Sequence, residues 1–128
     1  SGYSRGAGGL RGRAVARVPM IRTGTAAVRG SVSRDVIRRA IRLHSNAIRG
    51  AYERRLIQNP TLAGRITVQI VISPSGTVAN ASVQSSTLDH PGLEQDILNV
   101  FRRIRFPTAE GGGVVIVNYP LVFQPSPD

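Results

Sequence analysis

Two histidines and one acidic neighbour are the residues of this chain whose types could support metal binding or proton transfer. His44 lies among apolar residues at helical spacing, where a histidine is most often packed with one hydrogen bond and less often acts as a pH switch. Asp89 and His90 are adjacent, but no third ligand follows at the spacing that a zinc site requires. We therefore expect no metal site.

The remaining polar clusters do not match the patterns of hydrolases or phosphate-binding loops. The Ser-Ser-Thr run at 85–87 lacks a G-x-S-x-G context, so strand-end or capping roles suit it better than nucleophilic catalysis. Glu94 and Asp96 are two positions apart on a predicted helix, so their side chains diverge. The three glycines at 111–113 precede a strand and lack the Lys-Ser or Lys-Thr of a phosphate loop. We expect no catalytic residue and no cofactor, and hence a protein that is not an enzyme.

The composition indicates one folded domain. The chain has 128 residues, of which 41% are hydrophobic, and no cysteine, which excludes disulfides, thiolate zinc sites and cysteine nucleophiles. Its longest apolar stretch, residues 114–123, is interrupted by Asn118 and Pro120, whereas a membrane helix needs about 20 apolar residues. We expect no direct membrane span. The chain begins without Met or a signal peptide, so we expect it to be part of a longer protein.

The formal net charge of +10 is concentrated in the first half of the chain. Residues 1–30 have a net charge of +6, residues 31–58 of +5, and residues 59–128 of −1. The N-terminal arginines, continued by the following helix, could contact phosphates of a nucleic acid or another polyanion. They are Arg5, Arg11, Arg13, Arg17, Arg22 and Arg29. The chain has three Tyr and three Phe, most of them needed by the core, which leaves no stacking platform for bases. Polyanion binding is thus the alternative function, and no specific nucleic acid is expected.

Hydrophobic periodicity predicts one long helix over residues 33–59. A serine at 31 or 33 can cap it, and an Asn-Pro pair ends it, because the residue before proline avoids helical geometry. Arginines fall mainly on the face opposite the apolar stripe. The stripe consists of Ile37, Ala40, Ile41, Ala47, Ile48, Ala51, Tyr52 and Leu56.

A hairpin follows this helix. Residues 65–72 alternate between apolar and polar, which predicts a strand with one buried face. The Ser-Pro-Ser-Gly turn at 73–76 leads into a second strand over 77–85, whose Ala79, Ala81 and Val83 are expected to face the core.

The last part of the chain predicts a second helix and a third strand. The helix covers residues 90–103 and starts at a cap provided by Asp89 or Thr87. The glycine run at 111–113 connects it to the strand over 114–123. The expected inward face of that strand consists of Val115, Val117, Tyr119, Leu121 and Phe123.

The order helix, strand, strand, helix, strand predicts an α+β fold with two helices packed on one face of a three-stranded sheet. A right-handed crossover places the third strand parallel to the second, with the first strand between them and antiparallel to both, an order of 2-1-3. The third strand is then an edge. We expect a flexible Gly/Arg-rich linker over 1–29, in which residues 15–29 can add one short strand, a folded domain over 30–124 and a polar tail over 125–128.

An ordered set of short motifs resembles the TonB-type C-terminal domain. The set is Tyr52-Glu53, Asn59-Pro60, Leu62, Gly64, Pro74-Ser75-Gly76-Thr77-Val78, Ser86-Thr87-Leu88, Phe106-Pro107, Gly111-Gly112-Gly113, Tyr119-Pro120 and Phe123. No single motif is specific to this type of domain, but the order and spacing of the whole set over about residues 30–124 are specific to it. The chain is most similar to the AgmX/PglI variety, which occurs in proteins of adventurous gliding motility.

The resemblance implies a non-catalytic interaction module in the periplasm, within an inner-membrane-anchored protein. The partner would be an outer-membrane or periplasmic protein, and an inner-membrane motor would act through the parent protein's N-terminal part. The implied binding mode is addition of a short extended peptide to the third strand. That strand comprises Val114, Val115, Ile116, Val117, Asn118, Tyr119, Pro120, Leu121, Val122 and Phe123. Pro120 lacks a backbone donor and is tolerated where one side of a strand is unpaired.

One departure from the family concerns a pair of cysteines. Relatives usually have Cys before the Tyr-Glu pair and in the second helix, where this chain has Ala51 and Asp96. The disulfide that the resemblance would imply between the two helices is therefore missing. Asp96 then either faces solvent or pairs with His44, Arg102 or Arg103.

Overall fold

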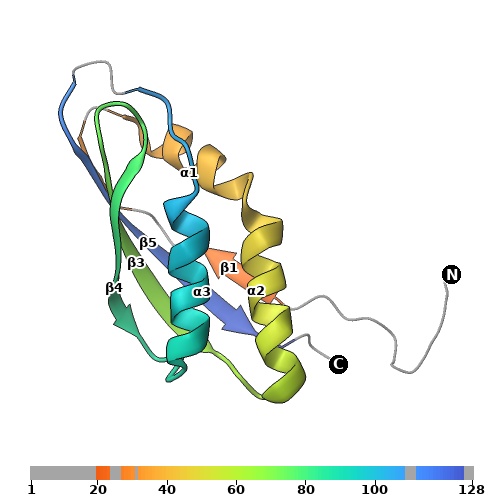
Figure 1. Ribbon diagram of the computed structural model, residues 1–128. Coiled ribbons are helices and arrows are strands. Elements are labelled where there is room, and N and C mark those ends of the chain that lie inside the picture. Colours follow the sequence, from red (N-terminus) through yellow and green to blue (C-terminus); the bar gives the residue numbers. More distant parts are fainter. Residues whose placement is uncertain (1–19, 24–26, 31, 109–111, 126–128) are drawn as a thin grey trace, which may run out of the picture.

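The computed structural model describes residues 20–23, 27–30, 32–108 and 112–125. The elements are β1 (Met20–Thr23), β2 (Ala27–Arg29), α1 (Arg34–Arg42), α2 (Ser45–Gln58), β3 (Gly64–Ile72), β4 (Val78–Ser86), α3 (Pro91–Arg102) and β5 (Val115–Gln124). The strands form one layer, and α2 and α3 lie side by side across one of its faces (Figure 1). The predicted α+β class is confirmed.

The central part of the sheet has the predicted topology. β3 pairs antiparallel with β4 on one side and with β5 on the other, which confirms the order 2-1-3. The pairing of β3 with β5 runs unbroken from Gly64 opposite Phe123 to Ile72 opposite Val115. This register aligns the apolar positions of both strands on the face that the helices cover.

β5 is not an edge strand, in contrast to the sequence prediction. β1 pairs antiparallel with Leu121–Gln124, and β2 pairs antiparallel with Ile116–Asn118. The prediction was wrong because residues 20–23 and 27–29 form two short strands where one at most was expected. These strands pair with backbone groups of β5 that an open edge would leave to solvent. Pro120 lies between the two pairings and has no partner in β1 or β2, which suits a residue without a backbone donor.

The predicted first helix is divided into two, α1 and α2, at Leu43 and His44. The amide of His44 bonds to the carbonyl of Ile41 at 2.9 Å, a bond over three residues instead of four that tightens the end of α1. The break turns Leu43 to solvent, where it is 83% exposed, while Ile41 and Ile48 both remain buried. The helix axis changes direction at this break (Figure 1), and each helix buries apolar residues, Ile37 and Ile41 in α1 and Ile48 and Tyr52 in α2.

The caps of the helices differ in part from those predicted. Ser33 accepts a hydrogen bond from the amide of Val36 at 3.3 Å and caps α1. The cap of α3 is His90, whose Nδ1 accepts from the amide of Leu93 at 2.9 Å, and not Asp89 or Thr87. An imidazole nitrogen that accepts this bond satisfies one of the free amides at the helix start.

β4 forms one edge of the described sheet, with β1 and β2 at the other, and it does not alternate as predicted. Its pairing with β3 shifts register between Thr67 and Val68 and again between Val71 and Ile72. Such bulges reset which side chains face the core. Consequently Ala81 is buried, whereas Ala79 is exposed and Val83 is only half-buried.

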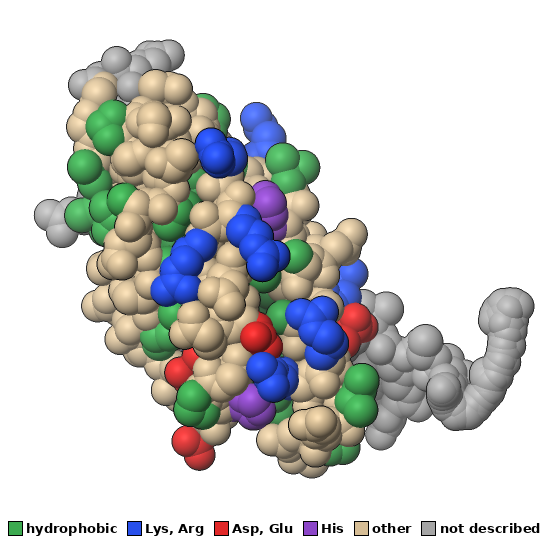
Figure 2. All heavy atoms as spheres, in the orientation of Figure 1, with side chains coloured by type: hydrophobic (Ala, Val, Ile, Leu, Met, Phe, Trp, Pro, Cys, Tyr) green, Lys and Arg blue, Asp and Glu red, His purple; other side chains and the backbone are tan. Residues whose placement is uncertain are grey.

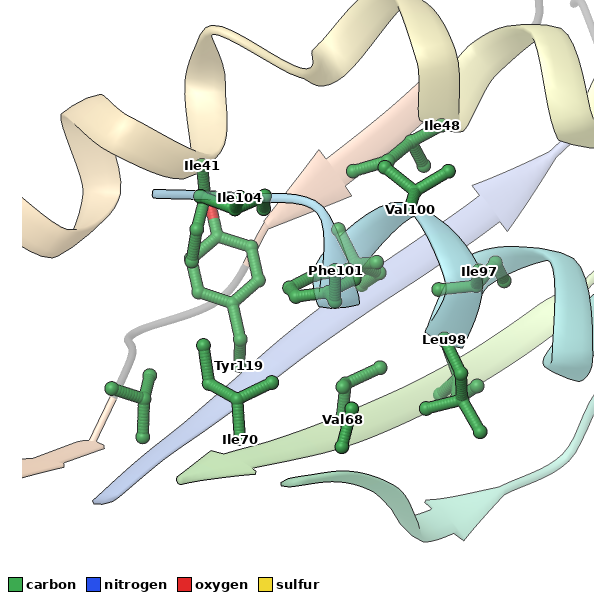
Figure 3. Packing of buried hydrophobic residues seen from close by; sticks show 14 of the residues in the cluster. Ile41, Ile48, Val68, Ile70, Ile97, Leu98, Val100, Phe101, Ile104 and Tyr119 are labelled. Atoms are coloured by element: carbon green, nitrogen blue, oxygen red, sulfur yellow. The ribbon is translucent and has the colours of Figure 1, made fainter. Parts of the chain in front are cut away.

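The core lies between the helices and the sheet (Figure 3). Two tilted aromatic pairs join the layers, Tyr52 with Phe123 at 4.9 Å between ring centroids and Phe101 with Tyr119 at 6.0 Å. Most apolar positions of the predicted stripes are buried there, with Ala47 an exception because it follows the break between α1 and α2. The buried residues shared by the prediction and the structure include Ile41, Ile48, Tyr52, Ile66, Val68, Ile70, Ile97, Val100 and Phe101.

Candidate interaction surface

β5 has two different faces and two different hydrogen-bonding sides. Its odd-numbered residues from 115 to 123 are buried against the helices, as predicted, and the even-numbered residues from 116 to 124 are half-buried on the other face. The inner hydrogen-bonding side pairs with β3 over nine residues. Its outer side is the candidate surface.

The outer side of β5 is occupied by short strands of the same chain. β1 contributes four residues and β2 contributes three, whereas β3 pairs with nine. Neither short strand pairs with Tyr119 or Pro120, so the outer ladder is interrupted in its middle. The outer side of β5 therefore accepts an extended antiparallel segment, through fewer and less continuous pairings than its inner side makes.

The predicted binding strand is displaced by one residue in the structure. Val114 lies outside β5 and its side chain is 52% exposed, whereas Gln124 belongs to the strand. Gly112 and Gly113 precede it with φ of 69° and 79°, a left-handed conformation that favours glycine. These glycines direct the chain into β5 without contributing to its pairing.

The residues considered for catalysis have structural positions. Ser86 Oγ accepts from the amide of Leu88 at 3.1 Å, and Thr87 Oγ1 accepts from the amide of Arg65 at 2.8 Å. His44 is the half-buried N-cap residue of α2, and its side chain makes no capping hydrogen bond. Within the described parts of the chain, no group of three His, Asp or Glu side chains could hold a metal ion.

Asp96 has a partner that the sequence prediction missed. Arg55 Nε lies 2.8 Å from Asp96 Oδ2, so the three expected partners (His44, Arg102 and Arg103) are not the ones that pair with it. Arg55 follows Ala51 by one helical turn, and the ion pair therefore joins α2 to α3 beside Ala51. That four-residue spacing from Ala51 was the signal available in the sequence.

The arginines proposed for polyanion contact do not form one described surface. Arg5, Arg11, Arg13 and Arg17 lie outside the described residues, and the structure places Arg22 in β1 and Arg29 in β2. On the face seen in Figure 2, basic side chains are spread over the helices, with acidic side chains beside some of them. This face therefore has no single basic patch.

Comparisons with known proteins give one match. No family model matches the chain, and no curated protein matches it, so neither supports the AgmX/PglI variety. The chain is similar to the solution NMR structure of the Pseudomonas aeruginosa TonB CTD, with a TM-score of 0.41 and 19% identity over 55% of this chain and 72% of that one. None of the helices in the described residues is long and apolar enough to cross a membrane.

Proposed function

We propose that this domain is a non-catalytic protein-interaction module that binds an extended peptide of a partner along the outer side of β5. The observation that supports this most directly is that β1 and β2 already occupy that side as added antiparallel strands. A partner segment could form the same backbone hydrogen bonds in their place, which is strand addition.

Replacement of residues 20–29 by a partner strand is energetically reasonable. Each backbone hydrogen bond contributes a net of about 0.5–1.5 kcal/mol, while ordering one residue costs about 1–2 kcal/mol. The seven residues of β1 and β2, in two separate strands, therefore gain little net free energy from pairing alone. A partner with a longer strand and apolar side chains toward the core would have the advantage.

The free edge at β4 is a less suitable docking site. It contains two register shifts against β3 within nine residues, and bulges twist an edge away from regular pairing. Only Ala81 of this strand is fully buried, so β4 offers little apolar surface beside its edge. β5 is regular over ten residues, with buried and half-buried positions alternating throughout.

We also propose a cellular setting, which rests on the sequence resemblance of residues 30–124 to TonB-type domains. In this proposal the domain is periplasmic and belongs to an inner-membrane-anchored protein. It binds an outer-membrane or periplasmic partner, and transmits force from an inner-membrane motor in gliding motility or energy transduction.

The proposal can be tested with the chain's own segment as a surrogate partner. A full-length variant in which residues 20–29 are replaced by alternating Gly and Ser should bind a synthetic peptide of residues 18–30, because Gly-rich chains form strands poorly. Chemical-shift mapping should then show changes along β5 and its neighbour β3. The unmodified chain should bind the peptide more weakly, since its own segment competes, and a peptide of scrambled order is the matched control.

Two outcomes of that titration would contradict the proposal. One is a set of shift changes confined to β4 or to the arginine-bearing side of α1. The other is equal binding of the peptide to the variant and to the unmodified chain, which would mean that residues 20–29 do not compete for the site.

A further inference from the structure

A small cavity lies where α1 meets α2, over the inner face of β5. Its volume is about 200 Å³. Its apolar walls are Ile41, Ile48, Tyr119 and Leu121, all of them buried core residues. Figure 3 shows the ring of Tyr119 rising from β5 toward Ile41. Its helical lining comes from the end of α1 and the start of α2, so the cavity lies at the break between the two helices.

The polar part of the lining is basic. Arg42 and Arg49 line the cavity together with Ser45, and no acidic side chain is among the described residues that line it. Arg49 Nε is buried and has no hydrogen-bond partner within the described chain, while its Nη1 donates to Asn46 Oδ1 at 3.4 Å. A buried donor without an acceptor is unfavourable, and more so when it belongs to a charged group. This nitrogen therefore requires an acceptor that the described chain does not supply.

The start of α2 adds to the same electrostatic field. α2 begins at Ser45 and has 14 residues, with no acidic residue in its first turn and no capping bond from the His44 side chain. The amides of Ala47 and Ile48 already bond to the carbonyl of His44, and the dipole of the helix favours an anion at this end. Two guanidinium groups, one of which contains the buried unpaired donor, and a helix start thus favour a negative ligand at one place.

We infer that this cavity binds a carboxylate attached to a short apolar chain. Arg49 and Arg42 would pair with the carboxylate, because guanidinium groups match its geometry with parallel charge-assisted hydrogen bonds. The apolar chain would lie against Ile41, Ile48 and Leu121. A volume of about 200 Å³ is below the size of typical drug-binding pockets, so the ligand is no larger than an amino-acid side chain or a short fatty acid.

This site is separate from the outer hydrogen-bonding side of β5, because its lining comes from the helices and from inward-facing side chains of that strand. It therefore does not depend on strand addition. Loss of peptide binding at β5 with retained carboxylate binding, or the reverse, would distinguish failure of one proposal from failure of the other.

The probe for the test is hexanoate, titrated into the full-length chain and followed by NMR. We expect shift changes at Ser45, Ile48 and Leu121 with millimolar affinity. The neutral isostere hexanamide should bind much more weakly, because it leaves the guanidinium groups unpaired. Arg49→Gln should weaken hexanoate binding by about tenfold or more. Arg54→Gln, an exposed position on the same helix, is the matched control and should leave binding unchanged.

Several results would overturn the inference. Absence of shift changes with hexanoate would show that the cavity takes no carboxylate, and equal binding of hexanamide would show that charge plays no part. Inorganic phosphate binding as tightly as hexanoate would show that the apolar walls play no part. If Arg49→Gln did not fold, as judged by circular dichroism, Arg42→Gln would replace it, and unchanged hexanoate affinity in that variant would equally overturn the inference.

Discussion

Replacing Phe101 by Ala tests whether α3 packs on the sheet as described. Phe101 is fully buried, and its ring lies 6.0 Å from that of Tyr119. Truncation of a buried Phe to Ala costs about 3–5 kcal/mol, through lost transfer free energy and the cavity left behind. Domains have unfolding free energies of about 5–15 kcal/mol, so we expect a loss of about a fifth or more of the total. Ile57→Ala is the matched control, since Ile57 is 80% exposed and should change stability by about 0.5 kcal/mol or less.

The assay is chemical denaturation followed by far-ultraviolet circular dichroism, because the chain has no Trp for fluorescence. Phe101→Ala should lower the midpoint and leave the slope of unfolding free energy against denaturant unchanged. A loss below about 1 kcal/mol would refute the reasoning, because such a value is typical of a residue at the surface.

Three further predictions concern a buried phenol, an ion pair and the basic N-terminal segment. Burial raises the pKa of Tyr52 to about 12, above an unfolded value of about 10. The neutral phenol therefore contributes fully to stability below pH ~10, and this contribution is lost as the pH rises toward ~12. Tyr52→Phe should remove this alkaline loss when unfolding is measured against pH, and a pH profile unchanged by the substitution would contradict the prediction. A double-mutant cycle on Arg55 and Asp96 should give a coupling of about 0.2–1 kcal/mol, because both side chains are partly exposed; zero coupling in low salt would show that the ion pair does not join the helices. Binding of the chain to generic RNA should be weak and steeply salt-dependent, and residues 1–29 should account for it. Salt-resistant, sequence-dependent binding by residues 30–128 would overturn the interaction-module proposal in favour of nucleic-acid binding.

The sequence predicted those parts of the fold in which local periodicity and burial coincide. The alternation of residues 65–72 and the helical stripe through Ile97 and Phe101 are local patterns, and the structure has both elements. The break at His44 was missed because the apolar spacing continues across it, while the change of direction is set by packing of both halves on the sheet. The exposure of Ala79 was missed because a bulge depends on the partner strand.

The candidate site was predictable on one side only. The inward face of β5 follows from alternation, but the occupation of its outer side by β1 and β2 depends on pairing between residues 87 to 104 positions apart. Gly24 and the short apolar patches around it gave little sign of two strands. The partner of Asp96 was missed for a related reason, since Arg55 lies 41 positions away and meets it only when α2 and α3 pack together.

Amide hydrogen exchange along β5 tests most directly whether the outer side of this strand can be vacated for a partner. The account predicts that amides bonded to β1 and β2 exchange through release of residues 20–29, with protection at least about tenfold lower than that of amides joining β5 to β3, a difference of about 1.4 kcal/mol or more. If both sets of amides exchanged with the same free energy, equal to that of global unfolding, the outer side would open only when the whole domain unfolds, and strand addition at β5 would be contradicted.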